Sequence, residues 1–442
     1  MKNHVSARGR ASRAPLLAAA LTAPLAAMML AWPGSAMAAP QASGFLQLRL
    51  TQRLHSLEPC TVPACSQMVQ QVLGELLLEP HLNQNANATL RVEAKTDQAS
   101  GESRLSVREA YLDWGNNAAA SLNLRLGRQI LTWGVSDYLY VNDIFPKNYD
   151  TFFTGAGLDR IKQPVDALRL TTRVAMKANA TADGVASEPS SPGGLDLELV
   201  LARAQADQAP QPNRFVAASG SRLAGASAHS SQADVALKLS TRLGSWDVAG
   251  YLADFQAREQ RFAIDAAGLQ VDQPRTRHLG MSITGNAAAG LIWLELALRQ
   301  SDQDQAALVS RYYLAHAGKL IAGYSREVAQ DTTASAQLQL EANLDYSHYL
   351  ARLAPGIRPV SRLNAVLHLR LSSRWANQTV GGGVQLFIDG EGDTHINPFG
   401  SWSPADGWTI EGGANLFAGK PDTRFGVLKD DSNLYLLGRY SF

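Results

Sequence analysis

The sequence has few cysteines, no excess of one charge and, beyond its first 40 residues, no long apolar run. Cys60 and Cys65 are its only cysteines. No later stretch reaches the ~18 consecutive apolar residues that a membrane-spanning helix requires. The 40 basic residues are balanced by 39 acidic ones, for a net charge of +1, and no basic runs occur. These absences exclude a chain built on spanning helices and argue against nucleic acid as a partner.

The N-terminus has the three parts of a secretory signal peptide. The first 13 residues carry four basic side chains and no acidic one, an apolar stretch follows from Pro15 to about Ala31, and Ala36 and Ala38 form an A-x-A site. We therefore expect residues 1–38 to be a signal peptide and residues 39–442 to form a single exported domain. The alternative is an N-terminal membrane anchor.

The two cysteines lie close together in "EPCTVPAC". An exported chain meets an oxidising compartment, so the sequence predicts a disulfide bond between Cys60 and Cys65. A metal site is not expected, because only His55 is near these two thiols in sequence.

Apolar and polar residues alternate with a period of two along many segments. In "LDLELVLAR" (195–203), four leucines share one face and both acidic residues share the other; "LNAVLHLRL" (363–371) has the same pattern. Such segments are typical of β-strands with one apolar and one charged face. They recur throughout the chain and predict an all-β protein.

Two architectures can use strands of this kind. A soluble β-sandwich buries the apolar faces between two sheets, whereas a transmembrane barrel turns them to lipid and the charged faces to a wet lumen. Several segments reach nine or more residues, which is the length of a tilted membrane-crossing strand. Length and the dense charge of the polar faces favour a transmembrane antiparallel β-barrel.

The last ten residues, "NLYLLGRYSF", alternate in the same way and end on Phe442. This ending resembles the C-terminal signal by which the barrel-assembly machinery recognises outer-membrane barrels, with Tyr440 and Phe442 as its aromatic residues. We count about 18 strands (16–18), and the rule of even strand numbers favours one strand over 308–325. Another strand is predicted over 336–348.

Three segments, "VREAYLDWG" (107–115), "LRLGRQILTWG" (124–134) and "FGVLKDDSNLYLLGRYSF" (425–442), resemble a Gram-negative outer-membrane porin-like family. That family includes the alginate-export-type barrels and related outer-membrane proteins of unassigned function. The resemblance implies one β-barrel of 16–18 strands in the outer membrane. It implies no substrate.

The densest mixture of aromatic and charged residues lies in 125–164, and its central part, 132–163, joins the fifth and sixth predicted strands. We expect this third extracellular loop to fold inward and narrow the lumen; an outward-projecting surface loop is the alternative. Loops 204–232 and 256–274 are rich in Gln, Ala, Ser and Gly and are predicted to be mobile caps. The candidate constriction residues are Asp137, Tyr138, Asp143, Lys147, Asp150, Asp159 and Arg160.

Basic residues recur on the faces predicted to line the lumen: Arg49, Arg91, Arg125, Arg169, Arg173, Arg299 and Arg370. They could form a ladder for solutes that carry carboxylate or phosphate groups. Acidic residues on the same faces, such as Asp97 and Glu295, make a paired structural network the equal alternative.

No enzyme is expected. Patterns such as HExxH, GxSxG and the nucleotide-binding loops do not occur, and Asp345 and Ser347 on a strand would point away from His348. "GEGDTH" (390–395) is interpreted as a polar turn. No catalytic residue and no cofactor is predicted.

The favoured function is an outer-membrane channel for passive or facilitated passage of small polar or charged solutes. The alternative is a scaffold or receptor barrel plugged by its loops. The expected partners are outer-membrane lipid and lipopolysaccharide, the barrel-assembly machinery and an unknown small solute.

Overall fold

The computed structural model describes residues 41–55, 66–115, 122–175, 194–210, 214–215, 233–259, 261–266, 268–302 and 306–442. All of them belong to one compact unit, Pro40–Phe442. The predicted signal peptide and the predicted Cys60–Cys65 disulfide lie outside the described residues, so both remain predictions.

The described unit consists almost entirely of strands. The barrel strands are β1 (Gln41–Arg53), β2 (Gln67–Glu79), β3 (His81–Asn83), β4 (Ala86–Asp97), β5 (Glu102–Gly115), β6 (Asn123–Ile130), β7 (Pro164–Ala175), β8 (Gly194–Arg203), β9 (Ala233–Leu243), β10 (Trp246–Gln256), β13 (Arg275–Ala287), β14 (Gly290–Ser301), β16 (His316–Ala329), β17 (Thr332–Asn343), β18 (Leu363–Trp375), β19 (Val380–Asp389), β20 (Thr394–Trp402), β21 (Trp408–Ala418) and β22 (Asn433–Ser441). The loops add β11 (Arg261–Asp265), β12 (Gly268–Asp272), β15 (Ala307–Leu308), the helices α2 (Tyr149–Phe152) and α4 (Tyr346–Arg352), and the 3-10 turns η1 (Leu158–Arg160) and η2 (Gly426–Asp431). No helix among the described residues is long and apolar enough to cross a membrane.

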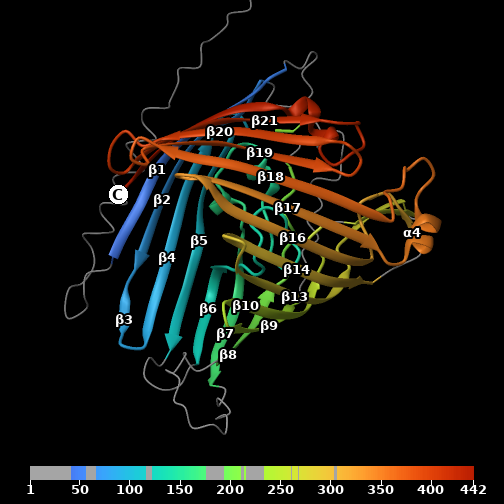
Figure 1. The fold of residues 1–442 in the computed structure, drawn as a ribbon, viewed down its shortest axis with the longest axis horizontal. Coiled ribbons are helices and arrows are strands. Elements are labelled where there is room, and N and C mark those ends of the chain that lie inside the picture. Colours follow the sequence, from blue (N-terminus) through green and yellow to red (C-terminus); the bar gives the residue numbers. More distant parts are fainter. Residues whose placement is uncertain are drawn as a thin grey trace, which may run out of the picture. The chain divides into compact units, whose positions relative to one another are not determined.

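The strands form a closed antiparallel barrel (Figure 1). Each strand pairs with the next along the chain, and β22 pairs with β1 over Phe45–Arg53, which closes the sheet. β3 continues β2 beyond Pro80, whose missing N–H interrupts the ladder. Counted with β2, β3 leaves 18 strands, so the predicted fold and strand number are confirmed.

Alternate residues along each strand face opposite sides of the barrel wall. In β1, the side chains of Gln47, Arg49 and Thr51 are buried in the interior, whereas Leu46 and Leu48 face outward with 57% and 49% of their surfaces exposed. The polar face therefore points into the lumen and the apolar face toward the surroundings, as expected of a membrane barrel.

The two ends of the barrel differ in their connections. Apart from the connections 116–122 and 176–193, one end carries short turns, such as Ala288–Ala289, where both residues have positive φ as in the tight turns of β-hairpins. The other end carries the long loops, among them 131–163. Large exposed aromatic side chains gather at the short-turn end: Trp114, Trp375, Trp402, Trp408, Tyr440 and Phe442. Such a belt marks a membrane–water interface.

Two local predictions need correction. The predicted strand 336–348 ends at Asn343, and the following residues form the short helix α4, with Asp345 preceding its first turn. Asp345 and His348 are therefore one helical turn apart and approach to 3.3 Å, contrary to the strand-based expectation. The barrel strand in 308–325 is single, as predicted, but begins only at His316.

Candidate functional site

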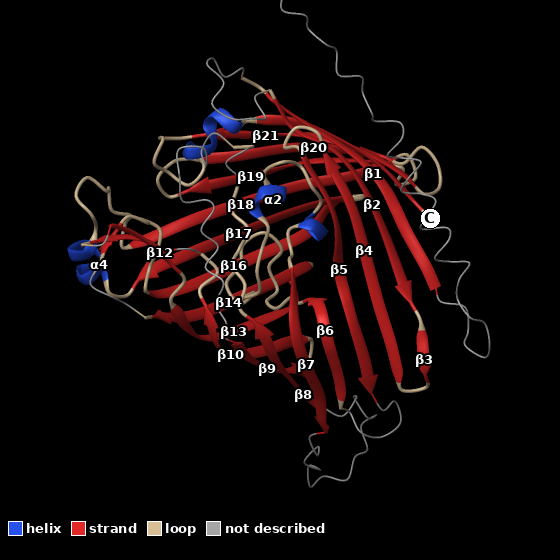
Figure 2. Ribbon diagram, turned by 180° about the vertical axis from the view of Figure 1, so that it is seen from behind, coloured by secondary structure: helices blue, strands red, loops and turns tan. Residues whose placement is uncertain are grey.

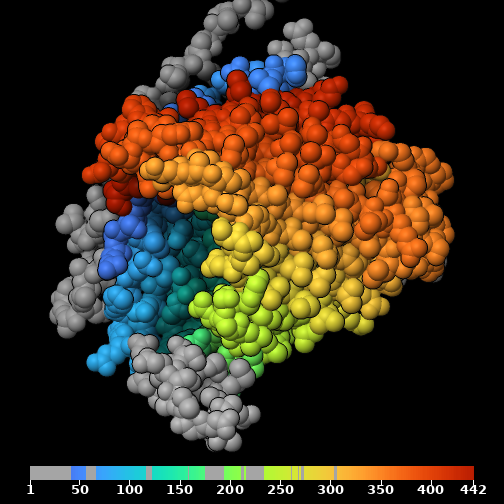
Figure 3. All heavy atoms as spheres, viewed as in Figure 1, coloured from blue at the N-terminus to red at the C-terminus, as the bar shows by residue number. Residues whose placement is uncertain are grey.

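The long loop between β6 and β7, residues 131–163, lies inside the barrel (Figure 2). We call it the inward loop. Its short helix α2 contacts the interior, and its backbone or side chains bond to strands on several sides of the wall, including β1, β2, β14 and β21. Viewed as spheres, the barrel is hollowed beside β1–β5, with teal atoms from between residues 100 and 200 deep in the hollow (Figure 3).

A single buried carboxylate holds the first part of the inward loop. Glu295 of β14 accepts hydrogen bonds from the backbone N–H groups of Val135 at 2.7 Å, Ser136 at 2.9 Å and Asn142 at 3.0 Å. Gly134 has a φ of +79°, and a Cβ there would lie 3.0 Å from both carboxylate oxygens. Glycine is therefore required at this position, both for its backbone conformation and for the close approach of Glu295.

Ion pairs hold the second part of the loop. Arg160 binds Glu75 at 2.7 Å and Glu93 at 2.6 Å, both on the barrel wall. Asp150 pairs with Arg214, a buried residue of the next long loop. Because Arg160 bridges two wall carboxylates, replacing it would remove the shorter ion pair of Glu75, which would keep only its 3.4 Å contact with Arg91, and would take a basic partner from Glu93.

The contacts of Arg214 show that the loop 204–232, predicted to be a mobile cap, is anchored inside the barrel at this residue. Its guanidinium binds Asp97 of β4 at 2.7 Å, and the neighbouring Phe215 is fully buried. The second long loop thus sends at least these two residues into the barrel. In the other predicted cap, β11 and β12 form a hairpin that pairs with β15 in a separate three-stranded sheet.

Aromatic rings form a third set of contacts between the inward loop and the wall. A stacked row crosses β18–β21: His368 on Phe387 with ring centroids at 4.3 Å, Phe387 on His395 at 5.5 Å, and His395 on Phe417 at 4.6 Å. The inward loop packs Tyr138, Phe152 and Phe153 on this row. We call these seven residues the aromatic seam.

The seam separates two cavities. The outer cavity, of about 840 Å³, lies toward the long-loop end and is lined by Lys319, Glu341 and Arg424 among others. The inner cavity, of about 690 Å³, lies toward the short-turn end and includes Arg370 and Glu411. Tyr138 and Phe152 line both cavities, so these two rings stand where one space gives way to the other.

The structure places the seven constriction candidates in three different environments. Asp143, Lys147, Asp150 and Arg160 are buried in ion pairs that hold the loop, and the Asp143–Lys147 pair spans 3.1 Å. Asp137 and Asp159 are exposed, and Tyr138 lies in the seam. The buried members offer no free charge to a passing solute.

The seven arginines predicted to line the lumen share the interior face but differ in their contacts. Arg91, Arg125, Arg169 and Arg173 are paired with carboxylates of neighbouring strands. Arg49 and Arg299 donate to the inward loop, at Thr154 and at the carbonyl of Val141. Arg370 lies over the rings of Tyr138 and Phe399, at 5.6 Å and 5.3 Å. Arg370 is therefore the member placed beside the seam.

Sequence reasoning missed the anchoring role of Glu295, which it considered only as a counter-charge for arginines. It also missed the aromatic seam. Period-two alternation places His368, Phe387, His395 and Phe417 on interior faces, but only strand register brings them into one row.

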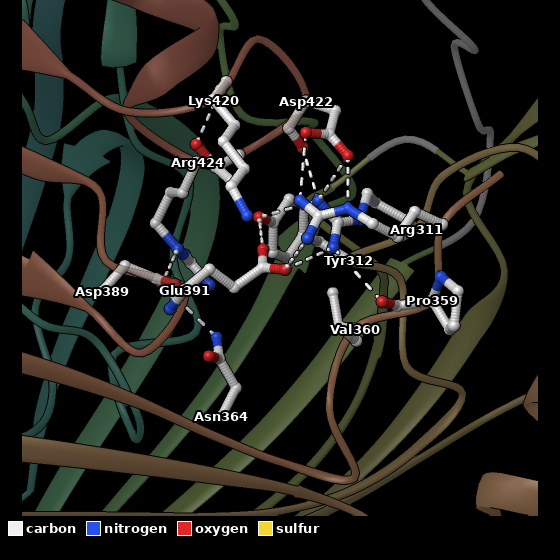
Figure 4. Close-up of polar contacts among 12 residues, drawn as sticks. Arg311, Tyr312, Pro359, Val360, Asn364, Asp389, Glu391, Lys420, Asp422 and Arg424 are labelled. Carbon is white, nitrogen blue, oxygen red and sulfur yellow. Dashed lines mark hydrogen bonds and ion pairs between the residues drawn. The ribbon is translucent and has the colours of Figure 1, made fainter.

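A cluster of charged groups links four loops at the long-loop end of the barrel (Figure 4). Arg311 binds Glu391 at 2.6 Å, Arg358 binds Asp422 at 2.7 Å, and Tyr312 donates to Glu391 at 2.6 Å. The polar turn predicted at 390–395 is present, and its Glu391 is the centre of this cluster. Arg424, which lines the outer cavity, lies over Tyr312 at 5.1 Å, so the cluster forms part of the cavity wall.

Asp207 gives the outer cavity a charge that depends on pH. Its carboxylate accepts the backbone N–H of Lys147 at 2.7 Å, and burial raises the pKa of the Asp207 carboxyl to about 6, against the opposing effect of the Lys147 ammonium. Lowering the pH through about 6 neutralises this carboxylate and removes one negative charge from the cavity.

We therefore expect the ratio of cation to anion permeability through the barrel to fall between pH 7.5 and pH 5. Reversal potentials in a salt gradient measure this change. Asp207→Asn, whose amide oxygen still accepts the Lys147 N–H, should lack the step and behave at both pH values like the wild type at pH 5. A wild-type step that persists in Asp207→Asn would assign the titration to another group.

Comparisons with known proteins agree on the fold. The chain is similar to Acinetobacter baumannii OccAB4 (TM-score 0.54, 10% identity, 92% of this chain and 98% of that chain), and to Pseudomonas aeruginosa OccK11 (OpdR) (TM-score 0.53, 10% identity, 91% and 96%) and OccK5 (OpdH) (TM-score 0.52, 12% identity, 91% and 98%). The chain has the fold of a porin-like barrel. At this identity the similarity concerns the fold alone.

Sequence comparisons say less about the family of this chain than the structural comparisons say about its fold. Residues 77–258 of this porin-like barrel, less than half of the chain, match the family described as "Protein of unknown function (DUF1302)". No curated protein matches the sequence. Within the described residues, no group of three or more His, Cys, Asp or Glu side chains is arranged to hold a metal ion.

Proposed function

We propose that this porin-like barrel is an outer-membrane channel for the passive or facilitated passage of small polar or charged solutes, with the inward loop as its constriction. The observation that carries the proposal is the pair of cavities, about 840 Å³ and 690 Å³, on either side of the seam. Charged side chains in the cavities on both sides of one narrow point are the arrangement of a selective pore.

The membrane orientation follows from the two ends. Apart from the connections 116–122 and 176–193, the barrel has short turns at one end and most of its long loops at the other. The start of β1 and the end of β22 lie at the short-turn end, and this arrangement is typical of outer-membrane barrels whose long loops face the outside. The outer cavity would then open toward the exterior and the inner cavity toward the periplasm.

Planar-bilayer recording of the purified protein tests the proposal. We expect discrete conductance steps that remain after the protein is repurified from a second detergent. Steps that vary with the preparation, or a complete lack of conductance, would contradict the channel.

The aromatic seam favours one alternative function, that of a receptor or scaffold barrel plugged by its loops. Tyr138 and Phe152 pack directly on the wall row, with Tyr138 and His368 centroids at 4.7 Å, so passage requires these rings to move. Absence of conductance in the wild type together with its appearance after removal of the loop would favour the plugged barrel.

Location and assembly are part of the same proposal. Tyr440 and Phe442 face outward at the short-turn end. The backbone of Phe442 exchanges two hydrogen bonds with Gly44, which completes the pairing of β22 with β1. Outer-membrane fractionation and the barrel yield after deletion of Phe442 test the location and the use of this ending by the assembly machinery.

A further inference from the structure

A row of polar side chains crosses four neighbouring strands on the outer surface of the barrel. Strand register places Asp254 of β10 beside Arg277 of β13, Arg277 beside Gln300 of β14, and Gln300 beside His316 of β16. All four lie near the long-loop ends of their strands, and their outward direction follows from the alternation in each strand. We call them the outer polar row.

Apolar residues lie directly below this row on the same face. Two positions further along each strand, register aligns Leu252, Leu279 and Leu298 with Gly318. The next aligned level contains Gly250, Met281, Leu296 and Leu320. The boundary between polar headgroups and acyl chains therefore falls between the outer polar row and the leucines.

A hollow of about 680 Å³ lies across this boundary and is lined by members of both levels. Gly318 lies beside two of the lining residues, because the atoms nearest to a Cβ placed there would belong to Leu344, at 3.6 Å, and Leu298, at 3.8 Å. Leu344, which follows β17, is exposed and forms a ridge beside the hollow. The absence of a side chain at residue 318 thus leaves room for an acyl chain on the wall.

The charges of the row leave one cation available. Asp254 pairs with Arg275, and His316 lies 3.9 Å from Asp345, so these two acidic groups have basic partners. The exposed Asp302 is a third acidic residue nearby, two positions after Gln300. No carboxylate in the described part of the chain pairs with the exposed Arg277. Its guanidinium and the Gln300 amide offer adjacent N–H donors that fit phosphate oxygens.

We propose that this hollow and the outer polar row form a binding site for lipopolysaccharide, with a lipid A phosphate on Arg277 and Gln300 and an acyl chain over Gly318. The inference rests on the proposed orientation, because that orientation puts the row at the outer leaflet. Lipopolysaccharide is the expected occupant because this lipid supplies phosphates and several acyl chains at the depth of the polar–apolar boundary.

Titration of the delipidated full-length protein with purified lipopolysaccharide, read by native mass spectrometry, tests the site. Arg277→Ala should weaken binding about tenfold, the effect of losing one charge-assisted phosphate contact. Gly318→Leu should weaken it comparably by filling the hollow, with the polar row intact. Arg326→Ala is the matched control, since this exposed arginine lies on the same outer face of β16 but near the short-turn end.

Three outcomes would overturn the site: unchanged affinity in both test variants, equal weakening by Arg326→Ala, or equally tight binding of phosphatidylglycerol or of dephosphorylated lipopolysaccharide. Single-channel conductance is recorded in parallel and should be the same in Arg277→Ala and the wild type. If the wild type conducts normally but does not bind lipopolysaccharide at this site, only the lipid site is contradicted. If the wild type shows no conductance at all, the channel is contradicted.

Discussion

Removal of residues 136–160, with a short Gly-Ser linker in their place, should raise the single-channel conductance severalfold while the barrel still assembles. The deletion takes away Tyr138 and Phe152, the two rings that line both cavities, and so joins the two spaces. The strand ends flanking the loop remain paired, Ile130 with Pro164, so a short linker can close the chain. Barrel closure by β1 and β22 does not involve the deleted residues.

The matched control is removal of α4, Tyr346–Arg352, another part of a long-end loop. None of its residues lines either cavity, so its loss should leave conductance unchanged. Heat-modifiable gel mobility verifies that each variant is folded. If the 136–160 deletion has the conductance and selectivity of the wild type, the inward loop is not the constriction.

Glu295→Ala should release the first part of the inward loop without unfolding the barrel. The substitution leaves three backbone N–H groups without their carboxylate acceptor. At about 1 kcal/mol or more for each lost bond, the free energy of local opening should fall by about 3 kcal/mol, which corresponds to roughly 100-fold faster amide exchange. Hydrogen exchange of the amides of residues 135, 136 and 142 measures this, and single-channel records should show added flicker.

Two further variants separate anchoring from charge. Glu341→Ala removes another interior carboxylate, which binds Lys319 at 2.6 Å and has no ion pair with the inward loop, so it should alter selectivity but leave exchange of the loop amides unchanged. Glu295→Gln keeps one acceptor oxygen and should have an intermediate effect. Normal amide exchange in Glu295→Ala would show that the ion pairs of Arg160 and the aromatic seam suffice to hold the loop.

Those anchors also show why the charges of the inward loop were difficult to interpret from sequence. The aromatic and ionic composition of 132–163 correctly identified the unusual loop. It could not distinguish charges that face a path from charges that hold the chain, because that distinction depends on partners more than 50 residues away, such as Glu75 for Arg160 and Glu295 for Val135. The same limit hid Arg214, whose loop has the composition of a mobile cap.

The sequence by itself determined the barrel, its approximate strand number and the direction of its faces. The physical reason is that β-structure has a side-chain period of two and a membrane demands one apolar face, so both requirements are recorded in neighbouring residues. Only the tertiary structure decided what the interior contains. Strand register aligned His368, Phe387, His395 and Phe417 into one row and put Glu295 under the loop, and register is a property of paired strands that no single segment encodes.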